Sequence, residues 1–261
     1  MWERWVEHDE PHIKESVMIV ALSTGLPQYF MLYSQARELA AFILENVENK
    51  KIATYYNSVM EEFANVGDDA IATLPTYEVY QLFPQRTSKR NDAILMLTGY
   101  ASPRNDVYEF CDRVLTKAVS KWGVKTLVSI GARWADEPTE PVLDSSRVYA
   151  FGASKTESQI IRRLDLAEHP AEMAPYFANV IASMAPLYGL MGFNLSVDHG
   201  EPRPHPRQKQ ALIRALCKLL EFNVDTSSLD LEAEKLKADV RFLNQAKGSR
   251  RQGPEDSGSS S

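Results

Sequence analysis

Three short apolar runs constrain the fold of this chain more than any other feature. They cover residues 17–22, 93–97 and 126–130. A short, nearly continuous apolar run predicts a strand that is buried on both faces. Stretches with apolar residues at helical spacing, such as 32–44 and 107–119, lie between the runs. Strands and helices that alternate in this way predict a mainly parallel sheet with helices on both faces.

Three further segments have shorter or less regular patterns. Residues 78–83 alternate between polar and apolar side chains, which is typical of a more exposed strand or of a strand at the edge of a sheet. Residues 184–191 are apolar and predict a helix, whose limits Pro186 and Gly189 leave open. Residues 193–197 predict the final strand of the sheet.

The charge and the cysteine content narrow the class of protein. Non-specific binding to nucleic acid needs a basic surface, so a net charge of −6 predicts that nucleic acid is not a partner. Two isolated cysteines, Cys111 and Cys217, are typical of reduced, buried thiols in a cytoplasmic protein. No window approaches the roughly 18 apolar residues of a membrane span. Because the first residues are polar and acidic, we also expect no signal peptide.

The closing part of the chain, residues 198–243, is a proline-rich loop followed by two amphipathic helices. Each helix has one apolar stripe, which must be buried either on the sheet or against a partner. The second alternative makes the stripes a candidate association surface, formed by Leu212, Leu216, Leu219, Leu229, Leu236 and Val240. These patterns divide the chain into an N-terminal extension (1–15), an α/β/α core (16–206), a C-terminal helical pair (207–247) and a disordered tail (248–261).

Candidate ligand-binding residues follow two of the predicted strands. Parallel sheets usually bind ligands outside the carboxyl ends of their strands. Gly131, Arg133 and Trp134 lie at one such end, where a guanidinium and an indole suit an anion or a flat ligand, unless Arg133 pairs with an acidic neighbour. His199 and Glu201 follow the last strand and carry groups for acid–base or metal chemistry.

Catalytic and metal-binding signatures are not found in the sequence. The three prolines after Glu201 make that segment extended and stiff, which would separate its polar groups. No serine lies in a Gly-x-Ser-x-Gly turn, and no paired metal-ligand spacing occurs. We therefore predict no catalytic residue, no metal site and no cofactor.

Four segments carry a resemblance to a known family. They are the strand and helix of 17–44, the run GVKTLVSIGA at 123–132, the strand RVYAFG at 147–152, and the closing segment 198–243. In order and pattern they resemble the proteasome assembly chaperone 2 family over nearly the whole chain. The resemblance implies a three-layer α/β/α sandwich with a mainly parallel mixed sheet, similar to that of phosphorylases and hydrolases, plus a C-terminal helical appendage.

The resemblance also implies a function. Eukaryotic members of the family help to assemble the proteasome α-ring, and archaeal relatives form oligomers. This chain departs from the family at Ser23-Thr24-Gly25, where many members have a glycine-rich stretch, and it has no tyrosine in its tail for docking to proteasome pockets. We expect a non-enzymatic chaperone-like or scaffolding protein that forms homo-oligomers, with proteasome subunits as partners. The alternative is a small-molecule or nucleotide-linked enzyme on a phosphorylase-like fold.

Overall fold

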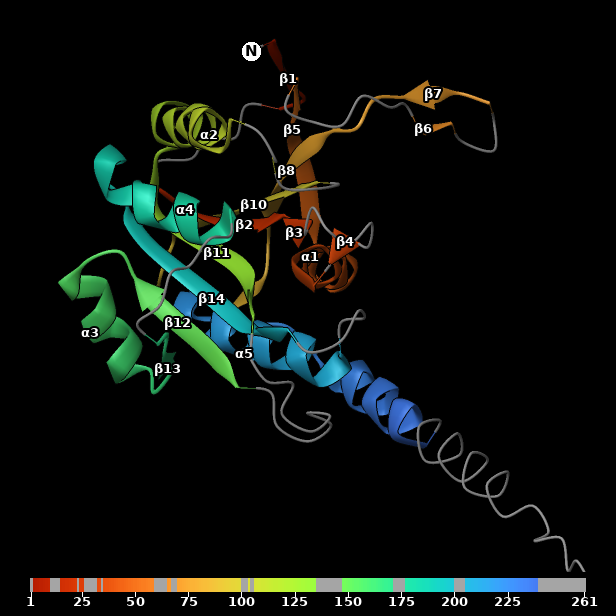
Figure 1. The fold of residues 1–261 in the computed structure, drawn as a ribbon, viewed down its shortest axis with the longest axis vertical. Helices are drawn as coiled ribbons and strands as arrows, with labels where there is room; N and C mark the ends of the chain where they lie inside the picture. Colours follow the sequence, from red (N-terminus) through yellow and green to blue (C-terminus); the bar gives the residue numbers. More distant parts are fainter. Residues whose placement is uncertain are drawn as a thin grey trace, which may run out of the picture.

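A computed structural model shows the chain folded around a large β-sheet (Figure 1). The residues that it describes are 2–9, 15–22, 24–25, 32–33, 35–58, 65–66, 70–99, 103, 106–134, 147–170, 177–199 and 205–238. Within these ranges the sheet has nine strands, in the spatial order β1 (Glu3–Glu7), β5 (Asn49–Asn57), β8 (Tyr77–Leu82), β10 (Ala93–Gly99), β2 (Ser16–Leu22), β11 (Val124–Trp134), β14 (Met191–His199), β12 (Val148–Gly152) and β13 (Ala167–Glu168).

Helices flank this sheet, and short ladders lie in its connections. The helices are α1 (Gln35–Asn46), α2 (Val107–Trp122), α3 (Lys155–Arg163), α4 (Phe177–Met184), the 3-10 helix η1 (Ala185–Tyr188), α5 (Pro206–Leu220) and a helix over residues 227–238, called the C-terminal helix below. The ladders pair β3 (Thr24–Gly25) with β4 (Leu32–Tyr33), β6 (Asn65–Val66) with β7 (Ala72–Thr73), and β9 (Gln85–Arg86) with β15 (Phe222–Asn223). None of the helices in the described ranges has the length and apolar character that a bilayer crossing requires.

The centre of the sheet is parallel and its sides are largely antiparallel. Strands β10, β2, β11 and β14 pair parallel to one another. On one side β8, β5 and β1 follow in antiparallel pairs, and on the other β12 pairs antiparallel with β14. The three apolar runs of the sequence lie in β2, β10 and β11, in the parallel centre. The predicted α/β fold with a mixed sheet is therefore confirmed.

Helices on both faces of the sheet make three layers. Figure 1 shows α2 and α4 on one face, and α1 and α5 on the other. Neighbouring residues of β2 alternate between the two cores: Met18 packs on the α2 and α4 side and Ile19 on the α1 and α5 side, and both are 0% exposed. Because each face has its own core, both sets of side chains must be apolar, which explains the continuous apolar runs.

The position of β8 decides between two alternatives that the sequence left open. The alternation in residues 78–83 indicated either a more exposed strand or an edge strand, and the edge strand is wrong because β8 lies between β5 and β10. Tyr77 and Val79 are buried in the core beneath α2, while Glu78 and Tyr80 on the opposite face are only partly buried. The alternation therefore marks a strand with one open face rather than a strand with a free edge.

The segment 184–191 corrects a second prediction. Instead of one helix, α4 ends at Met184, η1 follows, and β14 begins at Met191. Pro186 has no N–H for a continued α-helix. Gly189 has φ of 73°, and its N–H donates to the carbonyl of Pro186 at 3.1 Å, which closes the 3-10 turn.

Elements near both ends of the chain, β1 and α5, belong to the layers of the fold. β1 lies within the predicted extension (1–15), yet it pairs with β5, and Trp5 stacks on Tyr55 with ring centroids 4.1 Å apart. β1 is therefore a strand of the core sheet. At the other end, α5 is one of the helices that cover the α1 side of the sheet. The predicted tail (248–261) lies outside the described residues.

Candidate functional site

The carboxyl ends of the parallel strands meet at one edge of the sheet. In the ladder between β11 and β14, Gly131 lies opposite Ser196, Arg133 opposite Asp198, and Trp134 opposite His199. The structure thus brings four of the five predicted ligand-binding residues to adjacent positions on two neighbouring strands. The side chains of Arg133, Trp134 and His199, and the whole of Glu201, lie outside the described part of the chain.

A buried polar row lies below this edge, on the face that α4 covers. The Ser129 hydroxyl donates to the carbonyl of Ala178 in α4 at 2.6 Å, and Asn194 Nδ2 donates to Ser129 Oγ at 3.0 Å. Asn194 Oδ1 and Ser196 Oγ are buried without a hydrogen-bond partner among the described residues. Since Ser129 is 0% exposed and bound to the backbone, it ties α4 to the sheet and is not placed as a nucleophile.

Asn194 was not among the candidate residues that the sequence predicted. A signal was present in β14, where apolar residues 193, 195 and 197 alternate with Asn194 and Ser196. Such an alternation predicts that the second face of the strand is polar. Here that face is buried as well, because α4 packs over it. A buried polar row therefore results where the pattern alone suggests an exposed face.

The two cysteines are packing residues, as their sequence context predicted. Cys111 is buried in α2, Cys217 is partly buried in α5, and both are free thiols. Burial raises the pKa of the Cys111 thiol to about 12 and that of Cys217 to about 11. Because the thiolate is the reactive form, neither residue is a nucleophile near neutral pH.

His205 has a structural role at the start of α5. Its ring Nδ1 accepts a hydrogen bond from the backbone N–H of Arg207 at 3.2 Å, so the side chain caps the helix. Within the described ranges, no group of three or more histidine, cysteine or acidic side chains is arranged to hold a metal ion.

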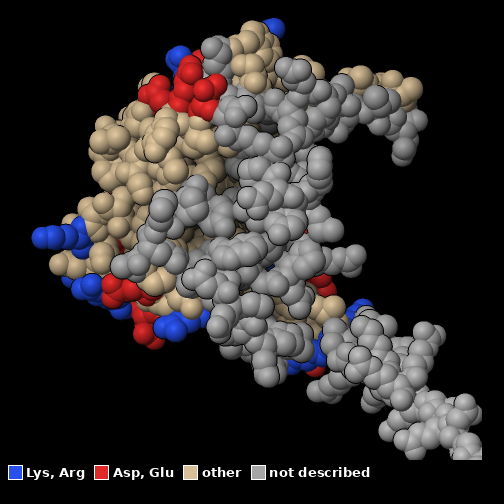
Figure 2. Space-filling model, in the orientation of Figure 1, with Lys and Arg blue, Asp and Glu red and all other residues tan. Residues whose placement is uncertain are grey.

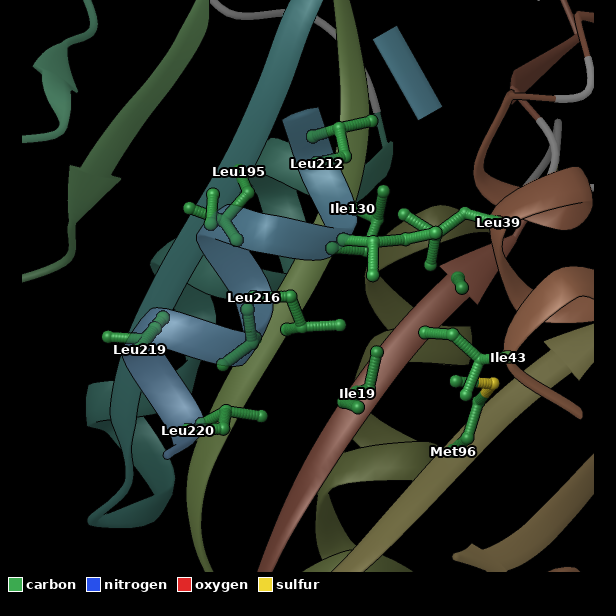
Figure 3. Packing of buried hydrophobic residues seen from close by; sticks show 14 of the residues in the cluster. Ile19, Leu39, Ile43, Met96, Ile130, Leu195, Leu212, Leu216, Leu219 and Leu220 are labelled. Carbon is green, nitrogen blue, oxygen red and sulfur yellow. The ribbon is translucent and has the colours of Figure 1, made fainter. Parts of the chain in front are cut away.

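The leucines predicted as an association surface lie mainly in the chain's own core. Figure 3 shows Leu212, Leu216 and Leu219 of α5 packed toward Ile130 and Leu195 of the sheet. The exposed fraction is 0% for Leu212 and Leu216 and 8% for Leu219. Within the C-terminal helix, the chain also buries Leu229 and covers part of Leu236, while Val240 lies outside the described residues. The sequence left open whether each apolar stripe is buried on the sheet or against a partner. The stripe of α5 is buried on the sheet.

An uncharged surface instead lies over α4 and η1. No charged residue occurs between residues 177 and 197. Leu187 is 80% exposed on this surface. Burial and a hydrogen bond to the carboxylate of Asp112 raise the pKa of the nearby Tyr188 to about 12, so the Tyr188 hydroxyl stays neutral. Figure 2 shows the side of the molecule that carries α4 and η1 as a broad tan area. The name α4–η1 face is used below for Val180, Ser183, Met184, Pro186, Leu187 and Tyr188.

Comparison with known proteins identifies the family. The model of the PAC2 family matches residues 36–243, which is well over half of the chain. This chain belongs to the PAC2 family. The match begins in α1 and runs from β5 to the closing helices, so β1 and β2 lie before it; it contains the segments 123–132, 147–152 and 198–243 of the resemblance to the proteasome assembly chaperone 2 family and the last part of 17–44. A comparison with curated proteins finds no match.

Solved structures of other proteins share the fold over most of the chain. PbaB of Pyrococcus furiosus, described as an archaeal proteasome activator, superposes with a TM-score of 0.76 at 16% identity, covering 93% of this chain and 98% of its own. Rv2125 of Mycobacterium tuberculosis, a proteasome-assembly chaperone homologue, gives 0.66 at 18% identity, with 86% and 94% covered. PbaA of P. furiosus, an archaeal homologue of proteasome-assembly chaperone, gives 0.65 at 16% identity, with 96% and 100% covered.

Proposed function

We propose that this protein is a cytoplasmic, chaperone-like or scaffolding member of the PAC2 family that acts through protein–protein association, with itself and with proteasome subunits. The observation that carries the proposal is the likeness to PbaB over 93% of this chain. Rv2125 and PbaA, both homologues of proteasome-assembly chaperones, support the same role. At sequence identities of 16–18%, a likeness between structures establishes the fold alone. The association of this chain with other proteins must therefore be measured.

The α4–η1 face is the surface that we propose for self-association, with a second copy of the chain as its occupant. A two-fold contact places the same patch of each protomer against its copy, so any charge in the patch faces a like charge. The chain has a net charge of −6, yet none of the six residues of this face is charged, and the neighbouring Asp112 carboxylate accepts a hydrogen bond from Tyr188, so these six residues can meet their own copies without that repulsion. Leu187 and Pro186 project from it as exposed apolar groups.

Light scattering of the purified wild-type chain tests this proposal. We expect a mass above that of one chain at micromolar concentration, which falls on dilution as mass action requires. A mass of one chain throughout the micromolar range would contradict self-association. Addition of purified proteasome α-subunits to the same sample is expected to give a heavier species that contains both proteins.

A further inference from the structure

A groove lies beside α1, over the face of β1, β5 and β8 that α2 does not cover. Its volume is about 990 Å³, which falls within the range of natural binding sites. Alternate residues of the three strands, including Trp5, Tyr55 and Tyr77, pack beneath α2 as an aromatic core. The other face forms the groove, and α1 provides its opposite wall. The lining of the groove includes Trp2, Arg4, Arg37, Tyr56, Leu74 and Glu78.

Glu78, an acidic side chain of this groove, already has a cationic partner within the chain. Glu78 Oε1 accepts a hydrogen bond from Lys51 Nζ at 2.8 Å, and its Oε2 accepts one from the Tyr80 hydroxyl at 2.6 Å. Burial alone would raise the pKa of Glu78, but these two donors hold it below its ordinary value. The carboxylate is therefore charged at neutral pH and is matched by the ammonium group of Lys51.

Among the described residues that line the groove, Arg4, Arg37 and Lys51 are cationic and Glu78 is acidic. Arg4 of β1 lies directly opposite Tyr56 of β5 in the antiparallel ladder. Within the described residues, neither Arg4 nor Tyr56 has an ion-pair or hydrogen-bond partner. Arg37 lines the groove from α1. A guanidinium and a phenol hydroxyl on adjacent strands form a pair of donors that suits a carboxylate.

The same groove also offers apolar surface. Trp2 is 56% exposed and Leu74 is 55% exposed, and both line the groove together with Val6 and Leu44. Large apolar side chains that remain exposed beside a groove are typical of protein-binding sites. A ligand that matches this site therefore needs an apolar group next to a negative one.

We propose that this groove binds an acidic peptide segment of a partner protein, in which a glutamate or aspartate lies beside an apolar residue. The peptide carboxylate binds Arg4 and the hydroxyl of Tyr56, and the apolar side chain packs on Trp2 and Leu74. Charge complementarity favours this occupant, because the groove carries local positive charge on a chain of net charge −6. Nucleic-acid binding needs several cations along the phosphate backbone, whereas one carboxylate needs a single cation beside the apolar surface. The inference names the partner chemistry for the proposed association function and rests on it.

Fluorescence anisotropy with a labelled peptide of alternating glutamate and leucine or phenylalanine residues tests the inference. We expect saturable binding to the wild-type chain and at least a tenfold loss of affinity in Arg4→Glu, which places a carboxylate against the peptide carboxylate. Arg163→Glu is the matched control, since Arg163 is exposed on α3 away from the groove and the charge change is the same. Tyr56→Phe, which removes only the hydroxyl, is expected to weaken binding severalfold and serves as a second variant if Arg4→Glu does not fold.

Three results would overturn the inference. They are equal affinities of the Arg4→Glu and Arg163→Glu variants, equal binding of a peptide with glutamine in place of glutamate, and tighter binding of a short oligonucleotide than of the acidic peptide. Light scattering of Arg4→Glu separates this inference from the function on which it rests. A variant that loses the peptide but keeps the wild-type mass changes the groove alone, whereas a wild-type chain without self-association contradicts the broader proposal.

Discussion

Replacing Gly192 with alanine is expected to lower the free energy of unfolding by about 3 kcal/mol or more. Gly192 lies at the start of β14, where α4 crosses the sheet closely. A Cβ at this position would overlap the backbone carbonyl oxygen of Ala182 and lie 2.9 Å from the Cβ of Ala185. Because a backbone atom cannot rotate away, α4 would have to move off the strand. Denaturation with urea, followed by circular dichroism, measures the effect.

Gly189→Ala is the matched control for this change. Gly189 has a φ of 73°, which strains any residue with a Cβ, but no atom lies within 4 Å of the position that the Cβ would occupy. We expect a cost of about 1 kcal/mol from the backbone conformation alone. A loss of stability in Gly189→Ala that equals or exceeds that of Gly192→Ala would show that the close approach of α4 is not the dominant constraint.

Leu216→Ala is expected to destabilise the chain by about 2–5 kcal/mol, because it removes a fully buried side chain and leaves a cavity. Leu216 is 0% exposed and belongs to the core between α5 and the sheet. The same denaturation measurement applies, and Leu231→Ala is the control. Leu231 lies on the C-terminal helix and is 68% exposed, so its loss should change stability by less than about 0.5 kcal/mol.

The Leu216 result also decides between the two possible places for the α5 stripe. If the stripe were buried between protomers, Leu216→Ala would change the mass of the particle while the stability of a dilute monomer stayed near that of the wild type. If it is buried on the sheet, as the structure has it, stability falls at every protein concentration. Equal stability of Leu216→Ala and Leu231→Ala would therefore contradict the position of α5.

The sequence predicted the centre of the sheet because burial on both faces leaves a direct mark. Val17 and Met18 belong to opposite cores, so β2 is apolar at successive positions. An amphipathic pattern is less specific, since it says that one face is buried without saying against what. This is why the stripe that contains Leu212 could be assigned either to a partner or to the sheet, and why the alternation around Glu78 suggested an edge strand.

The candidate site was predictable only in part for the same kind of reason. Gly131 and Trp134 could be placed at a strand end from local sequence, but their positions opposite Ser196 and His199 depend on a ladder between distant segments. Arg4 and Tyr56 form a pair only because β1 joins the sheet beside β5. The polar start of the chain gave no sign of that strand, so the groove could not be predicted from the sequence.

We propose above that this chain associates with its own copy through the α4–η1 face. Light scattering of the wild type, Leu187→Glu and Leu231→Glu in one dilution series tests it most directly. Both leucines are strongly exposed, at 80% and 68%, so neither change should unfold the chain. A charge buried in the contact and facing its copy should weaken association by at least about a hundredfold. We predict that Leu187→Glu has the mass of one chain while Leu231→Glu keeps the mass of the wild type. An unchanged mass in Leu187→Glu would contradict the claim.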